Sequence, residues 1–250
     1  MPSAWIVFDD AKTHCVGYMF PDHDEFDRRL RDARLAAMAE LAAGAGHEIN
    51  NPVATIVGRA RQLLASESDP NRRRALATIA SQALRIRDMI GDLMLFARPP
   101  EPEPATIDLA DVARQVVAPL ADRADEANVT LSVEAEQPVA AFADPQQLAV
   151  ALAALVENAM NAVDAGGHVA VAAFDTSDGP TLTVRDDGRG FSDADREHAF
   201  DPFYSGRQAG RGLGFGLPKA WRIVTLAGGT IHIESQPGET IVTMTLLRSQ

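Results

Sequence analysis

Cysteine, aromatic residues and long apolar runs are all scarce in this chain of 250 residues. The single cysteine, Cys15, excludes an internal disulfide and any metal site that needs several cysteines. No stretch reaches the roughly 18 uninterrupted apolar residues of a membrane span, so we expect none in this chain. The segment Met1–Phe8 lacks the basic start of a secretory signal and is followed by two aspartates. Together these absences predict a cytoplasmic protein.

Basic residues are also in the minority, because 23 lysines and arginines stand against 35 acidic residues, for a net charge of -12. A chain of this charge is a poor partner for nucleic acid. Residues 28–98 are the exception, with 12 arginines and seven acidic residues. This basic segment either receives an acidic protein partner or carries arginines that only solvate exposed helix faces.

Two amphipathic helices are predicted ahead of a proline-rich segment. The first runs from about Asp24 to Ala65, and the second runs from Pro70 to about Ala97 with Asp69 as its N-cap. Two helices cannot enclose a core, so we expect an antiparallel hairpin that dimerises into a four-helix bundle. Apolar residues at steps of three or four form one seam on each helix. The seams consist of Leu35, Met38, Ala42, Ala45, Ile49, Val53, Ile56, Ala60 and Leu63, and of Leu76, Ile79, Ala83, Ile86, Ile90 and Leu93.

A histidine stands off the seam of the first helix. The segment Ala45–Pro52 reads Ala-Gly-His-Glu-Ile-Asn-Asn-Pro. His47 lies two residues from the seam positions on either side, so at about 100° per residue it points away from the seam. Glu48 stands beside it, and Asn51 lies one turn further on, on the same face. These residues alone leave two readings open, a presented reactive histidine and a solvated surface pair.

The proline-rich segment Arg98–Pro104 predicts a stiff, extended linker and the main domain boundary. We therefore predict a short N-terminal β-hairpin or sensor stub over residues 1–23 and a dimerising helical hairpin over residues 24–98. The linker follows over residues 99–105, and a catalytic domain over residues 106–250.

The second domain mixes strands and helices. Strand pairs with helices to one side predict an α+β chain whose second domain is a two-layer α/β sandwich. The expected strands are 106–109, 129–134, 168–174, 181–186, 230–235 and 240–246, and the expected helices are 110–126, 145–164 and 216–227.

Polar side chains form two clusters in the first half of this domain. Asn158 and Asn161 lie one turn apart on one helix face. Their carboxamide oxygens suit a hard cation such as Mg²⁺, although such a pair can also hydrogen-bond a neighbouring loop. The segment Asp186–Gly190 follows an apolar strand, where the Asp186 carboxylate is an apt acceptor for an adenine amino group.

Glycine is concentrated in a later cluster. In the segment Gly210–Gly216, every second residue is glycine, and a helix follows. Such a run makes sense if backbone N–H groups wrap phosphates at the positive end of that helix. The segment Phe200–Tyr204 precedes the glycines. We expect a mobile lid from Ser192 to Arg211, in which Arg207 or Arg211 meets phosphate charge.

Together with the histidine, these clusters resemble the sequence boxes of sensor histidine kinases. The residues His47-Glu48 and Asn51-Pro52 resemble the H box of that family. The clusters at Asn158, Asp186–Gly190, Phe200–Tyr204 and Gly212–Gly216 resemble its N, G1, F and G2 boxes, in the family's order. The resemblance covers roughly residues 30–248.

The resemblance implies an ATP-dependent protein-histidine kinase that works with ATP and Mg²⁺. His47 would take the γ-phosphoryl group, and Glu48 would accept its proton or orient its ring. The group would pass to an aspartate on the receiver domain of a response regulator, and the kinase would be a homodimer. Asn51 matches a position where the family often orients water for dephosphorylation.

By the same resemblance, Asn158 would coordinate Mg²⁺ and Asp186 would recognise adenine. The nucleotide-binding set is Asn158, Asn161, Asp186, Gly188, Gly190, Phe203, Arg207, Arg211, Gly212, Gly214 and Gly216. One departure is Ala154, because the family's N box often has an asparagine four residues before the metal ligand.

Two other functions stay open at this point. One is a non-catalytic dimeric scaffold or phosphatase whose ATP domain only senses nucleotide. The other is an ATPase clamp of the gyrase and heat-shock chaperone type, whose fold the ATP domain shares. Such clamps have no use for an exposed His-Glu pair on a dimerisation hairpin, which disfavours them.

Overall fold

A computed structural model describes residues 23–204 and 214–249 of the chain. For part of the first helix, His47 included, only the backbone is described. The β-hairpin predicted near the N-terminus lies outside the described residues.

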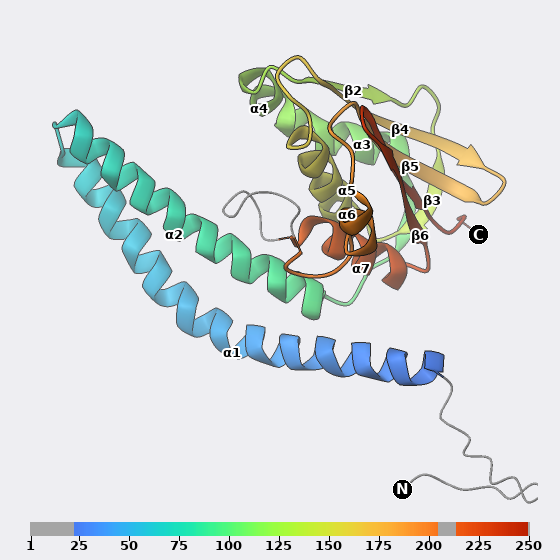
Figure 1. Ribbon diagram of the computed structural model, residues 1–250, viewed down its shortest axis with the longest axis horizontal. Helices are drawn as coiled ribbons and strands as arrows, with labels where there is room; N and C mark the ends of the chain where they lie inside the picture. Colours follow the sequence, from blue (N-terminus) through green and yellow to red (C-terminus); the bar gives the residue numbers. More distant parts are fainter. Residues whose placement is uncertain (1–22, 205–213, 250) are drawn as a thin grey trace, which may run out of the picture.

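A helical hairpin forms the first part of the structure. Helix α1 (His23–Ser66) and helix α2 (Pro70–Ala97) run antiparallel, and α2 packs against the C-terminal half of α1, while the N-terminal half of α1 extends beyond it (Figure 1). The side chain of Asp69 accepts hydrogen bonds from the backbone N–H groups of residues 71 and 72, and Pro70 occupies the first turn. The predicted hairpin and its cap are therefore confirmed. None of the described helices is long and apolar enough to cross a membrane.

The predicted seams divide into two sets in the hairpin. The seam residues Val53 and Ala83 are buried between α1 and α2 and form a small apolar cluster with Val57, which is not one of the predicted seam positions. Another set stays exposed within the single chain. It consists of Ile56, Leu63, Ile79 and Ile86, whose exposed fractions are 46%, 56%, 50% and 43%. One continuous seam for each helix is therefore a simplification, because only part of it faces the other helix of the same chain.

Helix α1 is bent (Figure 1) and contains Pro52. Proline has no N–H group to donate to the carbonyl of Glu48, four residues earlier, and its ring crowds that carbonyl. The helix therefore loses one backbone hydrogen bond immediately after residue 47.

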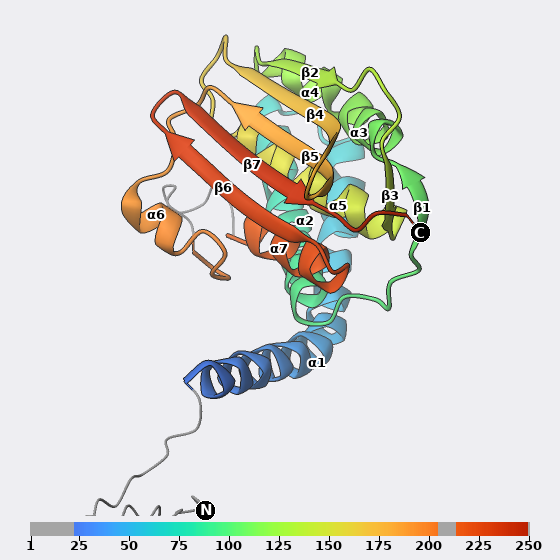
Figure 2. The ribbon, with the colours of Figure 1, turned by 90° about the vertical axis from the view of Figure 1, so that its right-hand side faces the viewer.

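The second domain is a five-stranded sheet covered on one face by helices (Figure 2). The strand order is β2-β4-β5-β7-β6, in which β2 and β4 are parallel and the other neighbours are antiparallel. A second, two-stranded antiparallel sheet pairs β1 with β3. The strands are β1 (Ala105–Asp108), β2 (Thr130–Glu134), β3 (Ala140–Ala143), β4 (His168–Thr176), β5 (Gly179–Asp186), β6 (Thr230–Gln236) and β7 (Glu239–Thr245). The predicted two-layer α/β sandwich is confirmed.

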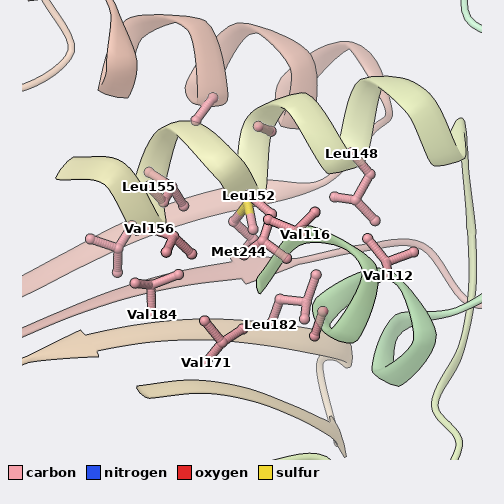
Figure 3. Close-up of a cluster of buried hydrophobic side chains, with 14 of the residues drawn as sticks. Val112, Val116, Leu148, Leu152, Leu155, Val156, Val171, Leu182, Val184 and Met244 are labelled. Atoms are coloured by element: carbon pink, nitrogen blue, oxygen red, sulfur yellow. The ribbon is translucent and has the colours of Figure 1, made fainter. Parts of the chain in front are cut away.

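Four helices of this domain pack on the sheet through one continuous apolar core. They are α3 (Leu109–Val117), α4 (Ala121–Glu126), α5 (Pro145–Met160) and α7 (Gly216–Leu226), whereas α6 (Asp193–Glu197) has no buried residue. Leu152 and Leu155 of α5 lie over Leu182 of β5 and Met244 of β7 (Figure 3), and each of these four side chains is at most 1% exposed. Helix α5 is thus held against the centre of the sheet.

Three features of this domain differ from the expected elements. The helix expected over residues 110–126 is broken by a 3₁₀ turn at Ala118–Leu120, because Pro119 cannot donate a helix hydrogen bond. Strand β3 was not predicted, since its sequence Ala-Ala-Phe-Ala carries little strand propensity. Helix α6 lies inside the expected lid, and it begins with a capping box between Ser192 and Asp195.

The proline-rich segment is attached to the second domain. The side-chain amide of Gln147 donates to the carbonyl oxygen of Pro100 at 3.0 Å. The backbone N–H of Glu103 donates to the Asp144 carboxylate at 2.7 Å. Burial alone would raise the pKa of Asp144, but the N–H groups of residues 147, 103 and 146 outweigh it and lower that pKa. The carboxylate therefore holds both the start of α5 and the end of the linker.

Candidate functional site

A cavity of about 570 Å³ lies between the second domain and α2. Its walls come from α2, from the end of α5, from the segment after β5 and from the start of α7. The volume lies in the range of small-molecule sites. Several of the predicted nucleotide-binding residues line it, namely Asn158, Asn161, Gly190, Gly214 and Gly216.

The two asparagines reach the cavity from the end of α5. Asn161 is the C-cap of the helix, and its side-chain amide donates to the carbonyl oxygen of Glu157 at 2.5 Å. Glu157 in turn pairs with Arg123 at 2.7 Å, and both line the cavity. The Asn161 amide therefore closes the last helical turn, whereas Asn158 lies one turn earlier on the same wall.

The turn after β5 requires glycine at two positions. Asp186 is 5% exposed, and its carboxylate accepts the backbone N–H of Gly188 at 3.0 Å. A Cβ atom on Gly188 would lie 2.6 Å from the carbonyl oxygen of Ala162. Gly190 has φ +74°, and a Cβ atom there would lie 2.5 Å from the carbonyl oxygen of Gln236. Asp186 and Gly188 shape this turn but are not among the described residues that line the cavity.

The start of α7 faces the cavity without a side-chain cap. Phe215 is the N-cap residue and makes no side-chain capping hydrogen bond, and both Phe215 and Gly216 line the cavity. The positive end of this helix is thus directed at the cavity, where its first N–H groups suit an anion. Gly214 has φ +70°, and a Cβ atom there would collide with the carbonyl of Tyr204. The remaining predicted residues Arg207, Arg211 and Gly212 lie outside the described residues.

A hydrogen-bonded cluster supports the segment before residue 205. The Tyr204 hydroxyl donates to Asp195 at 3.0 Å, and the Ser192 hydroxyl donates to the same carboxylate at 2.7 Å. The hydrogen bond from Ser192 lowers the pKa of Asp195, and the bond to Asp195 raises the pKa of Tyr204. Phe203 does not line the cavity, but its ring centroid lies 4.7 Å from that of Phe215, which does.

Charged side chains of both signs line the cavity. The basic ones are Arg85, Arg123, Arg189 and Lys219, and the acidic ones are Asp88, Asp92, Glu157 and Asp195. Among the described residues, no group of three or more His, Cys, Asp or Glu side chains could hold a metal ion by itself. The carboxamide oxygen of Asn158 on the cavity wall is of a type that suits Mg²⁺.

Helix α2 forms one wall of the cavity. The Lys219 ammonium on α7 donates to the Asp92 carboxylate on α2 at 2.6 Å. The ring centroids of Phe96 at the end of α2 and Phe215 lie 5.9 Å apart. The second domain is therefore docked on α2 in this structure (Figure 1).

The helix face that contains position 47 is open in the single chain. Positions three before and four and seven after residue 47 share its face, and Gly44, Asn51 and Ala54 there are all exposed. Glu48 is exposed as well. The imidazole of His47 lies outside the described side chains. The face on which it is carried is accessible, as the spacing of the seam predicts.

Two family models match the two parts of the chain. Residues 37–102 match the His Kinase A (phospho-acceptor) domain. Residues 143–250 match the family described as histidine kinase-, DNA gyrase B-, and HSP90-like ATPase. The chain has the two core domains of a sensor histidine kinase. The range matched by the phosphoacceptor model includes His47. The range matched by the ATPase model includes every predicted nucleotide-binding residue.

Curated relatives of this chain are named as histidine kinases. The chain is 30% identical over 237 residues to "Sensor histidine kinase ZraS" of Klebsiella oxytoca, covering 92% of this chain and 51% of the relative. It is 29% identical to "Signal transduction histidine-protein kinase AtoS" of Escherichia coli, strain K12, covering 95% of this chain and 38% of the relative. The chain thus spans about half, or less, of the length of these relatives.

Solved histidine kinases share the fold. Full-length ShkA in complex with AMPPNP matches with a TM-score of 0.70 at 23% identity, covering 84% of this chain and 47% of that one. The histidine kinase AdeS of Acinetobacter baumannii matches with a TM-score of 0.59 at 20% identity, covering 82% of this chain and 98% of that one. The arrangement of a helical hairpin and an α/β sandwich is therefore common to them.

Sequence reasoning missed the part of the cavity that comes from α2. Arg85, Asp88, Met89 and Asp92 line it, and they are separated from the ATPase domain by the linker. No box or periodicity distinguishes these four residues from others on a helix surface. Only the docked fold brings Asp92 to Lys219, 127 positions away in the chain.

Proposed function

We propose that this chain is the core of an ATP-dependent protein-histidine kinase that phosphorylates its own His47. The proposal is carried by the uncapped start of α7 at a cavity that Asn158 also lines. Backbone N–H groups and a helix dipole suit phosphate oxygens, and a carboxamide oxygen suits Mg²⁺. We assign the phosphates to Gly212, Gly214 and Gly216 and the adenine amino group to Asp186.

In this proposal, a ring nitrogen of His47 forms a bond to the γ-phosphorus of ATP. The bond from that phosphorus to the β,γ-bridging oxygen breaks, and ADP leaves. The attacking nitrogen is the unprotonated one of the neutral ring, and Glu48 orients the ring or accepts the proton of the other ring nitrogen, which leaves the phosphorylated ring neutral. When bound, Mg²⁺ supplies neutralisation of phosphate charge, and Asn158 is the residue that would hold it.

We further propose that the exposed apolar set on the hairpin is the dimer interface. Ile56 and Leu63 are seven residues apart on α1, and Ile79 and Ile86 are seven residues apart on α2. A seven-residue repeat on both helices is the pattern of a bundle seam. Two hairpins that join these faces bury all four side chains in a four-helix bundle, which supports a homodimer.

The phosphohistidine then needs an acceptor outside this chain. We assign that role to an aspartate on the receiver domain of a response regulator, in keeping with the names of the relatives. The exposed face of α1 around positions 44–54 would receive it.

Incubation with labelled ATP and Mg²⁺ tests the kinase proposal. We expect an acid-labile, base-stable phosphoprotein from the wild-type chain and none from His47→Gln. The matched control is His232→Gln, because His232 is an exposed histidine of β6 whose Nε2 atom lies 3.8 Å from the Glu234 carboxylate. Equal labelling of His47→Gln and wild type would show that His47 is not the acceptor.

A phosphatase activity is a second candidate, favoured by the exposure of Asn51. Its backbone carbonyl accepts a hydrogen bond from Thr55 at 3.0 Å, and its side chain is exposed one turn after residue 47. A carboxamide in this place can orient water toward a phosphorylated receiver domain. Asn51→Ala should slow receiver dephosphorylation while His47 still labels, whereas Asn71→Ala at the start of α2 should change neither. An unchanged dephosphorylation rate in Asn51→Ala would exclude this role.

A further inference from the structure

The ion pair between Lys219 and Asp92 is well enclosed. The two side chains are 13% and 35% exposed, and their atoms approach to 2.6 Å. By contrast, the Arg248–Asp175 pair at the surface of the second domain is 52% and 54% exposed. An ion pair is screened less when it is partly withdrawn from water. The electrostatic attraction between Lys219 and Asp92 is therefore stronger than that of the surface pair, and it joins α2 to the second domain.

An aromatic contact lies beside this ion pair. Phe96 of α2 and Phe215 at the start of α7 are 3% and 2% exposed, so the contact between their rings excludes water. We call the Lys219–Asp92 and Phe96–Phe215 contacts together the latch. The latch places the start of α7, which is the proposed phosphate end of the cavity, against α2.

A short segment connects the two sides of the latch. Helix α2 ends at Ala97, while Pro100 and Glu103 are hydrogen-bonded to the second domain. Only Arg98 and Pro99 separate the helix from the attached part of the linker. When the latch is open, these two residues are the connection between α2 and the domain. They permit the domain to rotate but keep it close to the end of α2.

The charges at the cavity differ between the docked and the undocked arrangement. Helix α2 contributes one basic and two acidic residues to the lining, Arg85, Asp88 and Asp92. The second domain contributes three basic and two acidic residues, namely Arg123, Arg189, Lys219, Glu157 and Asp195. The described lining residues of the docked cavity thus carry no net charge together, and undocking leaves those of the second domain with a net positive charge. A polyphosphate is therefore bound more strongly by the undocked domain.

We propose that the Lys219–Asp92 pair, supported by Phe96 and Phe215, is a latch that nucleotide phosphates open by competing with Asp92 for Lys219. This inference rests on the proposed function, because it takes the cavity to be the nucleotide site. A ligand that prefers the undocked arrangement shifts the population toward it, and docking in turn weakens the apparent affinity for that ligand. The latch therefore links the presence of ATP to the freedom of the domain to move.

A distance measurement without nucleotide tests the latch by itself. Spin labels at Gln82→Cys on α2 and Glu126→Cys on α4, in a Cys15→Ser chain diluted with excess unlabelled chain, report the separation of the two parts. We expect the distance distribution to shift and broaden in Asp92→Asn and to return toward wild type when Asp92→Lys is combined with Lys219→Asp. The matched control Asp175→Asn removes a surface ion pair and should leave the distribution unchanged. An unchanged distribution in Asp92→Asn would overturn the proposal.

A binding measurement with AMPPNP and Mg²⁺ tests the competition. Asp92→Asn should bind the analogue about fivefold more tightly than wild type, because a partly exposed ion pair contributes up to about that factor and no longer opposes binding. Adding AMPPNP to the labelled wild-type chain should shift the distance distribution toward that of Asp92→Asn. Absence of any binding would contradict the nucleotide site itself. Binding that leaves the distances unchanged, or that is weaker in Asp92→Asn, would refute the latch alone.

Discussion

Replacing Gly214 with alanine tests whether the backbone before α7 forms the phosphate end of the cavity. Gly214 has φ +70°, and a Cβ atom there would collide with the carbonyl of Tyr204. The left-handed backbone alone costs an L-residue about 1–2 kcal/mol. We therefore expect the chain to relax away from this conformation. Nucleotide binding would then have to restore it, so the cost should appear in the dissociation constant.

The expected change in affinity follows from that cost. About 1–2 kcal/mol corresponds to roughly fivefold to thirtyfold weaker binding of an ATP analogue, measured by calorimetry. Gly166→Ala is the matched control, because Gly166 also has a left-handed backbone, with φ +91°, but is not among the described residues that line the cavity. We expect less than about a twofold change there. Equal affinities of Gly214→Ala and wild type would refute this reasoning, as would equal losses in both variants.

Three other predictions follow from burial and charge. Leu152→Ala should lower the free energy of unfolding by about 3–5 kcal/mol in denaturant titrations, since Leu152 is fully buried, whereas the exposed Leu226→Ala should have little effect. The pKa of Asp195 is lowered in the folded chain, so its carboxylate stabilises the fold above its unfolded pKa, and this contribution is lost as pH falls through the folded pKa. Asp195→Asn should thus be less stable than wild type at neutral pH, and the difference should vanish in acid. Ile79→Glu should convert the dimer to monomers in light scattering, while Leu247→Glu, an equally exposed position in the second domain, should leave the dimer intact.

The sequence predicted the hairpin and much of the sandwich because these elements depend on interactions between residues that are close in the chain. Asp69 followed by Pro70 is a cap and a first turn in any context, and the structure has both. Strand β3 lacks such a signal, since its four residues are three alanines and a phenylalanine that pair with β1 across the fold. Its strand conformation is imposed by tertiary contacts rather than by propensity.

The residues of the candidate site could be predicted where they belong to short sequence motifs. Asn158 and Gly214 line one cavity, as their boxes imply, although more than 50 residues separate them. Asn161 was predicted on the correct face, yet its amide closes the end of α5, a role that spacing alone cannot reveal. Lys219 and Asp92 belong to different domains, and their pairing depends on docking, which leaves no trace in local patterns.

The latch and the proposed phosphoacceptor lie at the same position along the axis of the hairpin. A Cβ atom on Gly46 would lie 3.1 Å from the sulfur of Met94 and 3.6 Å from a methyl group of Ile90, so α1 approaches α2 closely beside residue 47. Asp92 lies between these two residues of α2, and Lys219 is bound there. The phosphate end of the cavity is thus held level with residue 47. If the latch opens as proposed, rotation of the domain about the connection at Arg98 and Pro99 would bring the γ-phosphate to His47. The domain would not have to move along the hairpin axis.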